Sequence, residues 1–341
     1  MGGIPFLLLA GTLYLVLDPF KVVHHYDSYI KSGTSGRVVL DKDYVSTQTF
    51  INNSKRIPYN AYIFGNSRSI FFEVADWKKH LPPSTNCFHF DASGESLVAL
   101  TKKVEFIDKT ENKIDHILLV LDYSILLQDE PRTDHIGAMS PVLVDYSNVI
   151  PFHYTFFSAF LNPKFMYAFL DFTISGQVKP YMKEKNLIDD RPTTYDSSTN
   201  EIRFDYFEKL IQENKFYTPK RVSVFYARDT TAPHYSALSI NKNQKAMLGS
   251  IKSIVNKHHT DIKVVISPLY DQMRLHQQDL AYLDSLFGKE NVFDFSGVNR
   301  FTKDYRNYYE DSHYRPHVAR ALFEILYDKN KTRKDSVATN N

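Results

Sequence analysis

Two short segments at opposite ends of the chain carry side chains whose types and spacing could do chemistry. Near the start, the apolar run Ala61–Phe64 leads through a glycine towards Ser67. Near the end, Glu310 and Asp311 stand three and two positions before His313. A carboxylate that orients an imidazole, an imidazole that accepts a proton and a hydroxyl that attacks a carbonyl together form an acyl-transfer nucleophile. The two segments therefore predict a serine-based acyl-transfer site.

The position of Ser67 favours this chemistry, because a helix-forming stretch, Arg68–Val74, follows it. The hydroxyl would lie where a strand ends and a helix begins, and there backbone N–H groups and the helix dipole stabilise an oxyanion. In the alternative interpretation Asn66, Ser67 or Ser69 only caps that helix, a role that suits both residue types. The alternative for His313 is a solvated surface loop. The presence of both segments in one chain weakens both alternatives.

The composition is that of an ordinary globular protein. The chain has 341 residues, 43% of them apolar, and a formal net charge of +2. Nucleic-acid binding would need a basic stripe rather than this near balance, so we expect no nucleic-acid partner. Cys87 is the only cysteine, which excludes an intramolecular disulfide and a multi-thiolate metal site. The adjacent pairs His24-His25 and His258-His259 would point to different faces of any regular element, so we expect no metal and no cofactor.

The N-terminal region is an apolar run, Ile4–Leu17, that ends at Asp18-Pro19. At about 14 residues it is short for a membrane span, which needs roughly 20. No Lys or Arg precedes it, so it lacks the basic start of a signal sequence. A signal-anchor whose basic start lies upstream and a buried first helix are both open interpretations. We favour the anchor, because soluble domains seldom open on an uninterrupted apolar run. A basic start upstream would place the body of the protein outside the cytoplasm.

Strand and helix patterns alternate along most of the chain after residue 58. Short apolar runs typical of strands are Ala61–Phe64, Cys87–Phe90, His116–Leu121, Val222–Tyr226, Lys263–Ser267 and Val292–Phe295. Amphipathic stretches typical of helices are Leu97–Asp108, Asn243–His258, Gln272–Phe287 and Pro316–Tyr327. Short apolar strands that alternate with helices predict an α/β protein with a parallel sheet covered on both faces.

This pattern predicts one domain with flanking segments. We expect a membrane anchor at 1–21, a stalk or irregular lead-in at 22–58, the α/β domain at 59–328 and a disordered tail at 329–341. The stretch 127–217 breaks the rhythm and is expected to be an insertion on the sheet that shapes a cleft or a docking face. Its aromatic patch, Phe152–Phe157, is predicted to be extra core rather than a sugar platform.

The segments described above resemble the SGNH/GDSL hydrolase superfamily. More narrowly, they resemble its membrane-anchored members, which include the alginate O-acetylation and teichoic-acid D-alanylation proteins. Phe64–Arg68 is similar to the nucleophile block, with Asn66 in place of the Asp of the GDS form. Phe90–Ser96 is similar to the second block, whose oxyanion-hole glycine would be Gly94, and Asp311–Pro316 resembles the last block with its acid and histidine. The resemblance implies a three-layer α/β/α fold around a flavodoxin-like parallel sheet, with one N-terminal transmembrane helix.

Two features depart from the superfamily pattern. The third block, an Asn in a Gly-x-Asn-Asp run, has no match, and the corresponding strand ends at Asp122, which cannot supply an amide donor. The oxyanion hole would then rest on the backbone N–H groups of Ser67 and Gly94. The common acid spacing of three residues before the histidine falls on Glu310, and the alginate-type spacing of two falls on Asp311. Both acids remain candidates, and we favour Asp311 because its side chain is shorter and more rigid.

The resemblance covers about residues 59–327 without the insertion and implies an extracytoplasmic serine esterase or O-acyltransferase. The triad would consist of Ser67, His313 and Asp311 or Glu310. Oxyanion or substrate contacts are expected from Asn66, Gly94 and Asp122. The implied substrate is an acyl ester, with acetyl as the expected group, of a surface glycan on a bacterial cell. Water as the acceptor would make an esterase, and a glycan hydroxyl would make a transferase.

The implied partners are the acylated glycan, a membrane-bound O-acyltransferase and the membrane itself, which a single N-terminal span would enter. Two other functions stay open. The first is a non-catalytic binding or assembly protein that keeps the fold, an option that the missing third block and the large insertion motivate. The second is a plain lipase-like esterase that needs no glycan. The fold alone cannot separate them, because one architecture hosts many activities.

Overall fold

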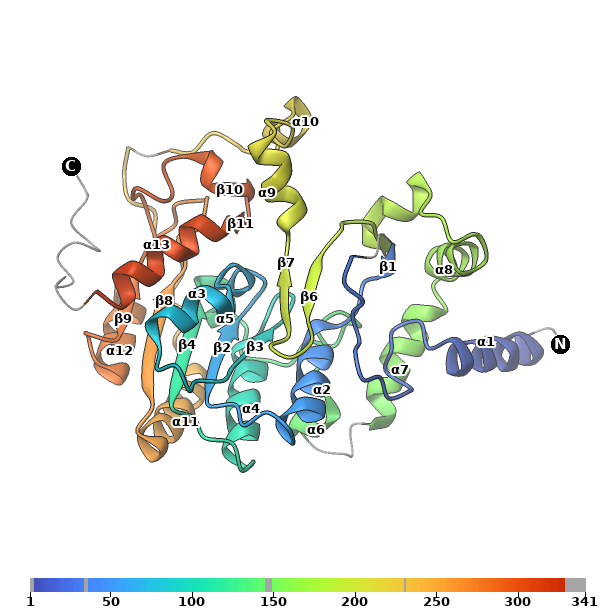
Figure 1. Cartoon of the computed structure of the whole chain (residues 1–341), viewed down its shortest axis with the longest axis horizontal. Helices are drawn as coiled ribbons and strands as arrows, with labels where there is room; N and C mark the ends of the chain where they lie inside the picture. Colours follow the sequence, from blue (N-terminus) through green and yellow to red (C-terminus); the bar gives the residue numbers. More distant parts are fainter. Residues whose placement is uncertain (1–2, 34–35, 145–148, 230, 329–341) are drawn as a thin grey trace.

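A five-stranded parallel sheet lies at the centre of the structure (Figure 1). The computed structural model describes residues 3–33, 36–144, 149–229 and 231–328. The strands lie in the order β3-β2-β4-β8-β9, and every neighbouring pair is parallel. Their bounds are β2 Ala61–Gly65, β3 Cys87–Asp91, β4 His116–Leu121, β8 Asp261–Ile266 and β9 Val292–Asp294. The predicted α/β class with a parallel sheet is confirmed.

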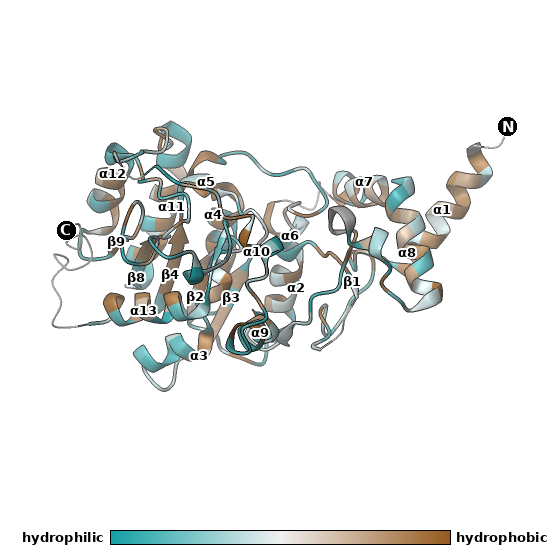
Figure 2. Ribbon diagram, turned by 90° about the horizontal axis from the view of Figure 1, so that it is seen from above, coloured by the Kyte–Doolittle hydropathy of each residue, from teal (hydrophilic) through white to brown (hydrophobic). Residues whose placement is uncertain are grey.

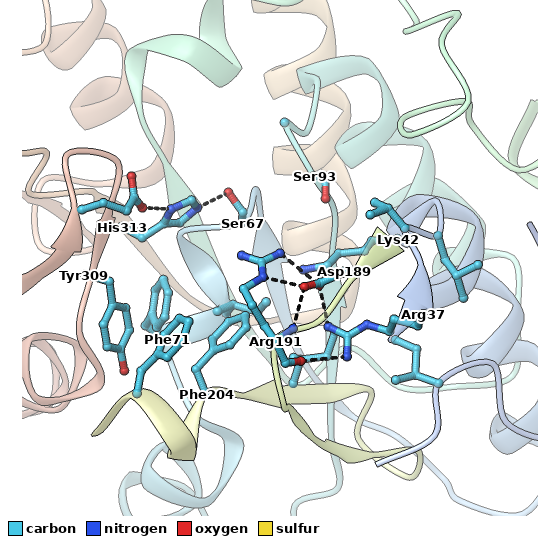
Figure 3. A pocket seen from close by; sticks show the side chains of 18 of the residues that line it. Arg37, Lys42, Ser67, Phe71, Ser93, Asp189, Arg191, Phe204, Tyr309 and His313 are labelled. Atoms are coloured by element: carbon cyan, nitrogen blue, oxygen red, sulfur yellow. Dashed lines mark hydrogen bonds and ion pairs between the residues drawn. The ribbon is translucent and has the colours of Figure 1, made fainter. Parts of the chain in front are cut away.

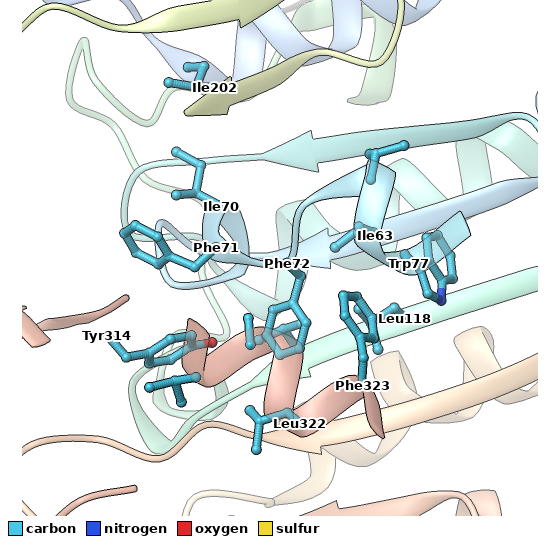
Figure 4. Close-up of a cluster of buried hydrophobic side chains, with 14 of the residues drawn as sticks. Ile63, Ile70, Phe71, Phe72, Trp77, Leu118, Ile202, Tyr314, Leu322 and Phe323 are labelled. Carbon is cyan, nitrogen blue, oxygen red and sulfur yellow. The ribbon is translucent and has the colours of Figure 1, made fainter. Parts of the chain in front are cut away.

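Alternate side chains of the central strands enter two separate cores, because successive residues of a strand point to opposite faces. Along β2, Ala61 and Ile63 pack with α3 and α13, whereas Tyr62 and Phe64 pack with α4, α11 and α12. Figure 4 shows part of the first core, where Ile63 lies among aromatic side chains. Helices thus cover both faces of the sheet (Figure 2). Their bounds are α3 Val74–Trp77, α4 Leu97–Asp108, α11 Lys242–His258, α12 Gln277–Phe287 and α13 Pro316–Leu326.

One predicted strand, Val222–Tyr226, is wrong, whereas the others are present within two residues of their expected bounds. A short helix, α10 Pro219–Val222, ends at the first residue of this stretch instead. The side chain of Thr218 accepts a hydrogen bond from the backbone N–H of Arg221, and proline suits the first helical turn. The residues that follow leave the helix with Val224 and Tyr226 nearly half exposed. An alternating apolar pattern therefore marks a surface segment at this place.

The segment that precedes the sheet differs from the stalk or irregular lead-in that we expected at 22–58. It contains α2, Lys42–Ser54, which packs against the sheet. Phe50 of this helix is fully buried against Phe88 and Phe90 of β3. No apolar stripe marks α2 in the sequence, because its buried face also carries Ser46, Thr47 and Thr49. The Ser46 and Thr47 hydroxyls donate to a carbonyl oxygen within the helix, which satisfies them without external partners.

The apolar N-terminal run forms α1, Gly3–Leu17. At about 1.5 Å per residue, its 15 residues extend over about 22 Å, less than the roughly 30 Å of a bilayer core. Within the described ranges no helix is long and apolar enough to cross a membrane, so the transmembrane helix that we expected is not found. Ala10 and Tyr14 are buried, and the Tyr14 ring contacts Phe157 and Phe160 of the insertion. Most other side chains of α1 are exposed. The expected tail at 329–341 lies outside the described residues.

The insertion builds an α-helical lobe and the strands that connect it to the sheet. Its elements are α6 Pro141–Val144, α7 Val149–Phe160, α8 Pro163–Ser175, the 3-10 helix η4 Pro180–Asn186, β5 Ile188–Asp189, β6 Thr194–Asp196, β7 Glu201–Arg203 and α9 Asp205–Gln212. Phe152, Phe156 and Phe160 are buried in a core shared by α1, α7 and α8. This packing matches the prediction that the aromatic patch is extra core.

Two of the inserted strands cover the exposed edge of the sheet. The hairpin of β6 and β7 turns at Thr199 and Asn200, and the Thr199 carbonyl oxygen accepts a 2.9 Å hydrogen bond from the backbone N–H of His89 on β3. The Asn200 amide donates to the His89 carbonyl oxygen at 2.8 Å. Covered edges protect a sheet from pairing with other chains. A third inserted strand, β5, pairs with β1, Arg37–Val38, and so ties the insertion to the segment that precedes α2.

The buried position of Phe50 predicts that α2 stabilises the domain. The substitution Phe50→Ala should lower the free energy of unfolding by about 3–5 kcal/mol, because a fully buried ring leaves a cavity. Ile150→Ala is the control, since Ile150 is 81% exposed and should change stability by less than about 0.5 kcal/mol. Urea unfolding followed by tryptophan fluorescence measures both. Equal, small effects of the two substitutions would contradict this assignment of α2.

Candidate active site

The turn after β2 places Ser67 at the carboxyl end of the sheet. Gly65 is required there, because a Cβ would lie 2.7 Å from the Val120 carbonyl oxygen and 2.8 Å from the Ser69 Cβ. The chain then folds back tightly. The carbonyl oxygen of Asn66 accepts hydrogen bonds from both the backbone N–H and the hydroxyl of Ser69, each at 2.8 Å. The turn therefore leaves the Ser67 side chain partly exposed, whereas Asn66 and Ser69 are buried.

The helix that we expected over Arg68–Val74 is not present. A single 3-10 turn, η1 Ser69–Phe71, follows the serine, and the four-residue helix α3 begins only at Val74. Phe72 interrupts the helical path with a ψ of 80°, and its ring is fully buried in the core beneath the turn. Such short helices contribute little dipole. Any stabilisation of an oxyanion here must come from individual N–H groups.

The side chain of Ser67 lies against His313. Its hydroxyl oxygen is 2.8 Å from Nε2 of the imidazole, although 246 positions separate the two residues in sequence. The other ring nitrogen, Nδ1, is hydrogen-bonded to Oε1 of Glu310 (Figure 3). Glu310 and His313 are opposite residues in the hairpin of β10, Tyr308–Glu310, and β11, His313–Tyr314. Carboxylate, imidazole and hydroxyl thus stand in the order of a serine acyl-transfer triad.

Glu310, and not the favoured Asp311, is the acid that contacts the histidine. Burial alone would raise the pKa of Glu310, but the hydrogen bond and the charge of His313 outweigh it and hold that pKa below its usual value. Asp311 is exposed at the turn of the hairpin. Desolvation and the neighbouring Glu310 carboxylate raise its pKa. The hairpin register decides between the two candidates, because it pairs position 310 with position 313.

A buried network joins the serine turn to the end of β4. Asp122 is 1% exposed and caps α5, Tyr123–Leu127, by accepting two backbone N–H groups. Its Oδ2 also accepts from the Asn66 amide at 2.8 Å and from the Arg68 guanidinium at 2.7 Å. Arg68 Nε donates to the carbonyl oxygen of Ser312 at 3.2 Å. One guanidinium therefore links the ends of β2 and β4 to the hairpin that carries the histidine.

This network changes the roles expected of Asn66 and Asp122. We expect both to bind an oxyanion or substrate, yet the Asn66 amide donates to Asp122, and neither residue lines the cavity beside Ser67. Burial opposes ionisation of Asp122, but the Arg68 charge and several hydrogen bonds lower its pKa. A carboxylate accepts hydrogen bonds and cannot donate them. The two residues position the serine turn and do not replace the missing amide donor.

The glycine that we expect in the oxyanion hole lies beside the serine. Gly94 has a φ of +62°, a left-handed conformation that favours glycine, and it lines the same cavity as Ser67. A Cβ at this position would lie 2.8 Å from the Arg132 side chain. Arg132 fixes the turn by donating to the carbonyl oxygens of Ser93 and Gly94. The geometry therefore keeps Gly94 as a candidate oxyanion-hole residue.

A cavity of about 430 Å³ opens beside the triad (Figure 3). Ser67, Glu310 and His313 contribute to its lining. We call its aromatic residues the aromatic wall, which consists of Phe71, Phe204, Phe207 and Tyr309. We call its cations the basic wall, which consists of Arg37, Lys42, Arg191 and Arg221. A cavity of this size admits a sugar unit or a similar small group.

Most of the wall residues escape prediction from the sequence. Arg37 and Lys42 fall in the segment expected to be a lead-in, and Arg191 and Phe204 fall in the insertion. The only available signal was the expectation that the insertion shapes a cleft. That expectation gives a region but no residue, because strand pairing between β1 and β5 is what brings the two segments together.

A second serine–histidine pair lies buried beneath the turn. The Ser69 hydroxyl oxygen is 2.9 Å from Nε2 of His89, and both side chains have no exposed surface. Since the Ser69 hydroxyl donates to the Asn66 carbonyl oxygen, the imidazole Nε2 donates to Ser69. Complete burial lowers the pKa of His89 to about 4, and the nearby Asp91 carboxylate opposes this shift only in part. The pair is inaccessible to substrate and supports the Ser67 turn.

Comparison of the chain with models of known protein families and with curated proteins finds no match in either. Among the described residues, no group of three or more His, Cys, Asp or Glu side chains is arranged to hold a metal ion.

The buried His89 predicts a pH-dependent stability. The imidazole stays neutral in the folded protein down to pH of about 4 but is protonated below about 6.5 when unfolded. The unfolded state therefore binds the extra proton, and acidification from pH 6.5 to 4 should remove about 3 kcal/mol of stability through this residue. In His89→Gln this loss should vanish, so the stability gap between the two proteins should narrow on acidification. Urea unfolding at both pH values measures it.

The control for this test is His25→Gln, because His25 is exposed and forms only a distant contact with an exposed carboxylate. As a substitution of an exposed side chain, it should change stability by less than about 0.5 kcal/mol. A gap for His89→Gln that is independent of pH would contradict the assignment of His89 as a neutral buried imidazole.

Proposed function

We propose that the protein is a serine-dependent esterase or O-acyltransferase. The observation that carries the proposal is the contact of Ser67 with His313 at 2.8 Å, with Glu310 on the opposite ring nitrogen, beside an open cavity. The fold does not require this hydrogen-bonded series of three side chains, because it lies at a partly exposed position. Its chemical use is to remove a proton from the serine as the oxygen attacks an ester.

In the proposed mechanism, the Ser67 oxygen attacks the carbonyl carbon of an acyl ester while His313 Nε2 takes the hydroxyl proton. Glu310 holds the ring orientation and stabilises the imidazolium. His313 then gives the proton to the leaving alcohol oxygen, and the acyl group stays on Ser67. Water or a sugar hydroxyl attacks the carbonyl carbon of this acyl-serine and loses its proton to His313, which returns it to the serine oxygen as the bond between that oxygen and the acyl carbon breaks. The N–H groups of Ser67 and Gly94 are the proposed donors to both oxyanions.

The proposed substrate is an acyl ester, with acetyl as the expected group, of a bacterial surface glycan. Support comes from the resemblance to SGNH/GDSL hydrolases and from the aromatic wall, since aromatic faces commonly pack on sugar rings. We further propose that the exposed apolar side chains of α1 associate with a membrane and that the domain acts outside the cytoplasm. A membrane-bound O-acyltransferase is the proposed partner.

A non-catalytic binding protein is the second candidate function. The observation that favours it is Asp122, an ionised carboxylate at the position where the superfamily pattern has an amide donor. Asp122 would leave the oxyanion hole with two donors rather than three. Loss of one such donor lowers kcat by roughly 100- to 1,000-fold. The triad geometry is nevertheless complete, and for this reason we prefer the catalytic function.

The triad predicts which substitutions abolish turnover. With the full-length chain in a mild non-ionic detergent, Ser67→Ala and His313→Ala should each lower kcat/KM for p-nitrophenyl acetate at least about 1,000-fold, because they act as one unit. Glu310→Gln should lower it about 100- to 10,000-fold, since the imidazolium loses its counter-charge. Asp311→Asn is the matched control and should change it less than about threefold. An Asp311 effect larger than that of Glu310 would overturn the assignment of the acid.

A covalent fluorophosphonate probe separates the two candidate functions without a chosen substrate. The proposed nucleophile predicts labelling of the intact chain and loss of labelling in Ser67→Ala, with the protein otherwise folded. Unlabelled intact protein would favour the binding function. The plain-esterase alternative predicts that added glycan leaves acetyl-ester turnover unchanged, and a transferase predicts transfer of the acetyl group to the glycan.

A further inference from the structure

The basic wall of the cavity carries more positive charge than its carboxylates balance. Arg37 and Arg191 share one carboxylate, Asp189, which accepts from Arg37 at 2.8 Å and from Arg191 at 2.8 and 3.1 Å. Lys42 pairs with the buried Asp91 at 2.7 Å. A shared carboxylate neutralises only one of two guanidinium groups. One unit of positive charge therefore remains at the Arg37–Arg191 pair.

The fourth cation of the wall has no carboxylate partner among the described residues. Arg221 instead lies over two aromatic faces, 4.2 Å from the Phe216 ring centre and 5.1 Å from that of Phe207. Cation–π contacts of this kind hold a guanidinium in place without neutralising it. Phe207 is also part of the aromatic wall. Arg221 thus adds a second charge without a carboxylate partner, and the Glu310 carboxylate, which lines the same cavity, offsets part of this surplus.

Arg191 is the member of the wall whose charge is influenced by the triad carboxylate Glu310. In Figure 3 its guanidinium is drawn between the Ser67–His313 pair and the Arg37–Asp189 pair. Within the described chain its hydrogen bonds to Asp189 use Nε and Nη2. Asp189 and Asp190 raise its pKa against the effect of burial, and Glu310 of the triad contributes to the same shift. Asp190 is itself paired with Lys183. The guanidinium is therefore held firmly charged, with donors left for a ligand.

Two guanidinium groups face a single carboxylate in this part of the cavity, and the Arg191 side chain is about half exposed. Arg37 is mostly buried, and burial together with the neighbouring Arg191 charge lowers its pKa, although Asp189 opposes this. Two like charges placed side by side in a cavity repel each other, and the repulsion is relieved when a second anion enters. Structural pairing of Asp189 would need only one arginine. The surplus points to a ligand.

We propose that the basic wall binds an anionic group, a carboxylate or a phosphate, of the glycan whose acyl ester reaches Ser67. Arg191 and Arg221 are the principal contacts, and guanidinium groups suit both anions because they donate two parallel hydrogen bonds. The aromatic wall packs on the sugar, and the basic wall selects sugar units that carry the charge. This inference rests on the proposed acyl-transfer function for the role of the ligand, and its binding test does not depend on turnover.

The test uses the full-length Ser67→Ala protein in non-ionic detergent, so that the ligand is not consumed. Isothermal titration calorimetry at about 50 mM salt compares trigalacturonate with neutral maltotriose, and glycerol 3-phosphate with glycerol. The proposal predicts that at least one anion binds about tenfold or more tightly than its neutral match and that raising the salt weakens it. The two pairs of ligands distinguish a carboxylate-bearing glycan from a phosphate-bearing one. Equal affinity for charged and neutral ligands, or binding of neither anion, would overturn it.

Substitutions locate the binding in the basic wall. Arg191→Gln should weaken the anion about tenfold, and Asp189 keeps Arg37 as a partner in this variant. Arg221→Gln, which breaks no ion pair, should weaken it about fivefold. Arg56→Gln is the matched control, because it removes the same charge from an exposed position outside the cavity. Asp189→Asn should strengthen binding, a change of opposite sign that a purely structural role would not produce. An Arg56 effect equal to that of Arg191 would overturn the assignment.

The two proposals can fail separately. Labelling of Ser67 by the fluorophosphonate probe without any anion preference would retain the acyl-transfer function and overturn the anionic substrate. Anion binding by a protein whose Ser67 resists the probe would support the anion site and overturn the catalytic function.

Discussion

The buried ion pair between Arg68 and Asp122 is the interaction on which the rest of the site depends. It lies at the point where the strand order of the sheet reverses, because β3 and β4 pair with opposite edges of β2. Ligands of open α/β sheets bind at such a point. The same guanidinium reaches the carbonyl oxygen of Ser312 and so holds the hairpin of His313 over the serine turn. Removing either partner would leave a buried charge unpaired, which commonly costs about 3–5 kcal/mol.

A second charged cluster anchors the other side of the cavity. Lys103 on α4 is fully buried and pairs with Asp43 on α2, at 2.8 Å, and with Glu95. Glu95 directly follows Gly94, so the cluster fixes the candidate oxyanion turn to two helices. Desolvation of these groups is expensive, and mutual pairing offsets it only when the geometry is well formed. The sheet and its helices therefore hold the reacting groups rigidly, while the insertion adds the cavity walls around them.

Local patterns predicted the sheet and most helices because each strand is a short apolar run and each covering helix has one apolar face. They failed at α2, whose buried face contains hydroxyls satisfied within the helix, and at Val222–Tyr226, where apolar side chains lie on a surface segment. They also failed after Ser67, since a buried Phe72 ends the expected helix after one turn. In each case the deciding contact either joins the segment to a distant part of the chain or leaves no periodic apolar pattern in the sequence.

The sequence by itself determined the α/β class and the types of the reacting residues, because strand alternation and the Ser67 and His313 segments are local properties. Only the tertiary structure decided that Glu310 rather than Asp311 contacts the imidazole, through the hairpin register. It likewise decided that Asp122 and Asn66 position the turn and that Arg191 enters the cavity. The physical reason is the same throughout. A side chain's role depends on its partners, and here the partners come from strands and loops that sequence order keeps far apart.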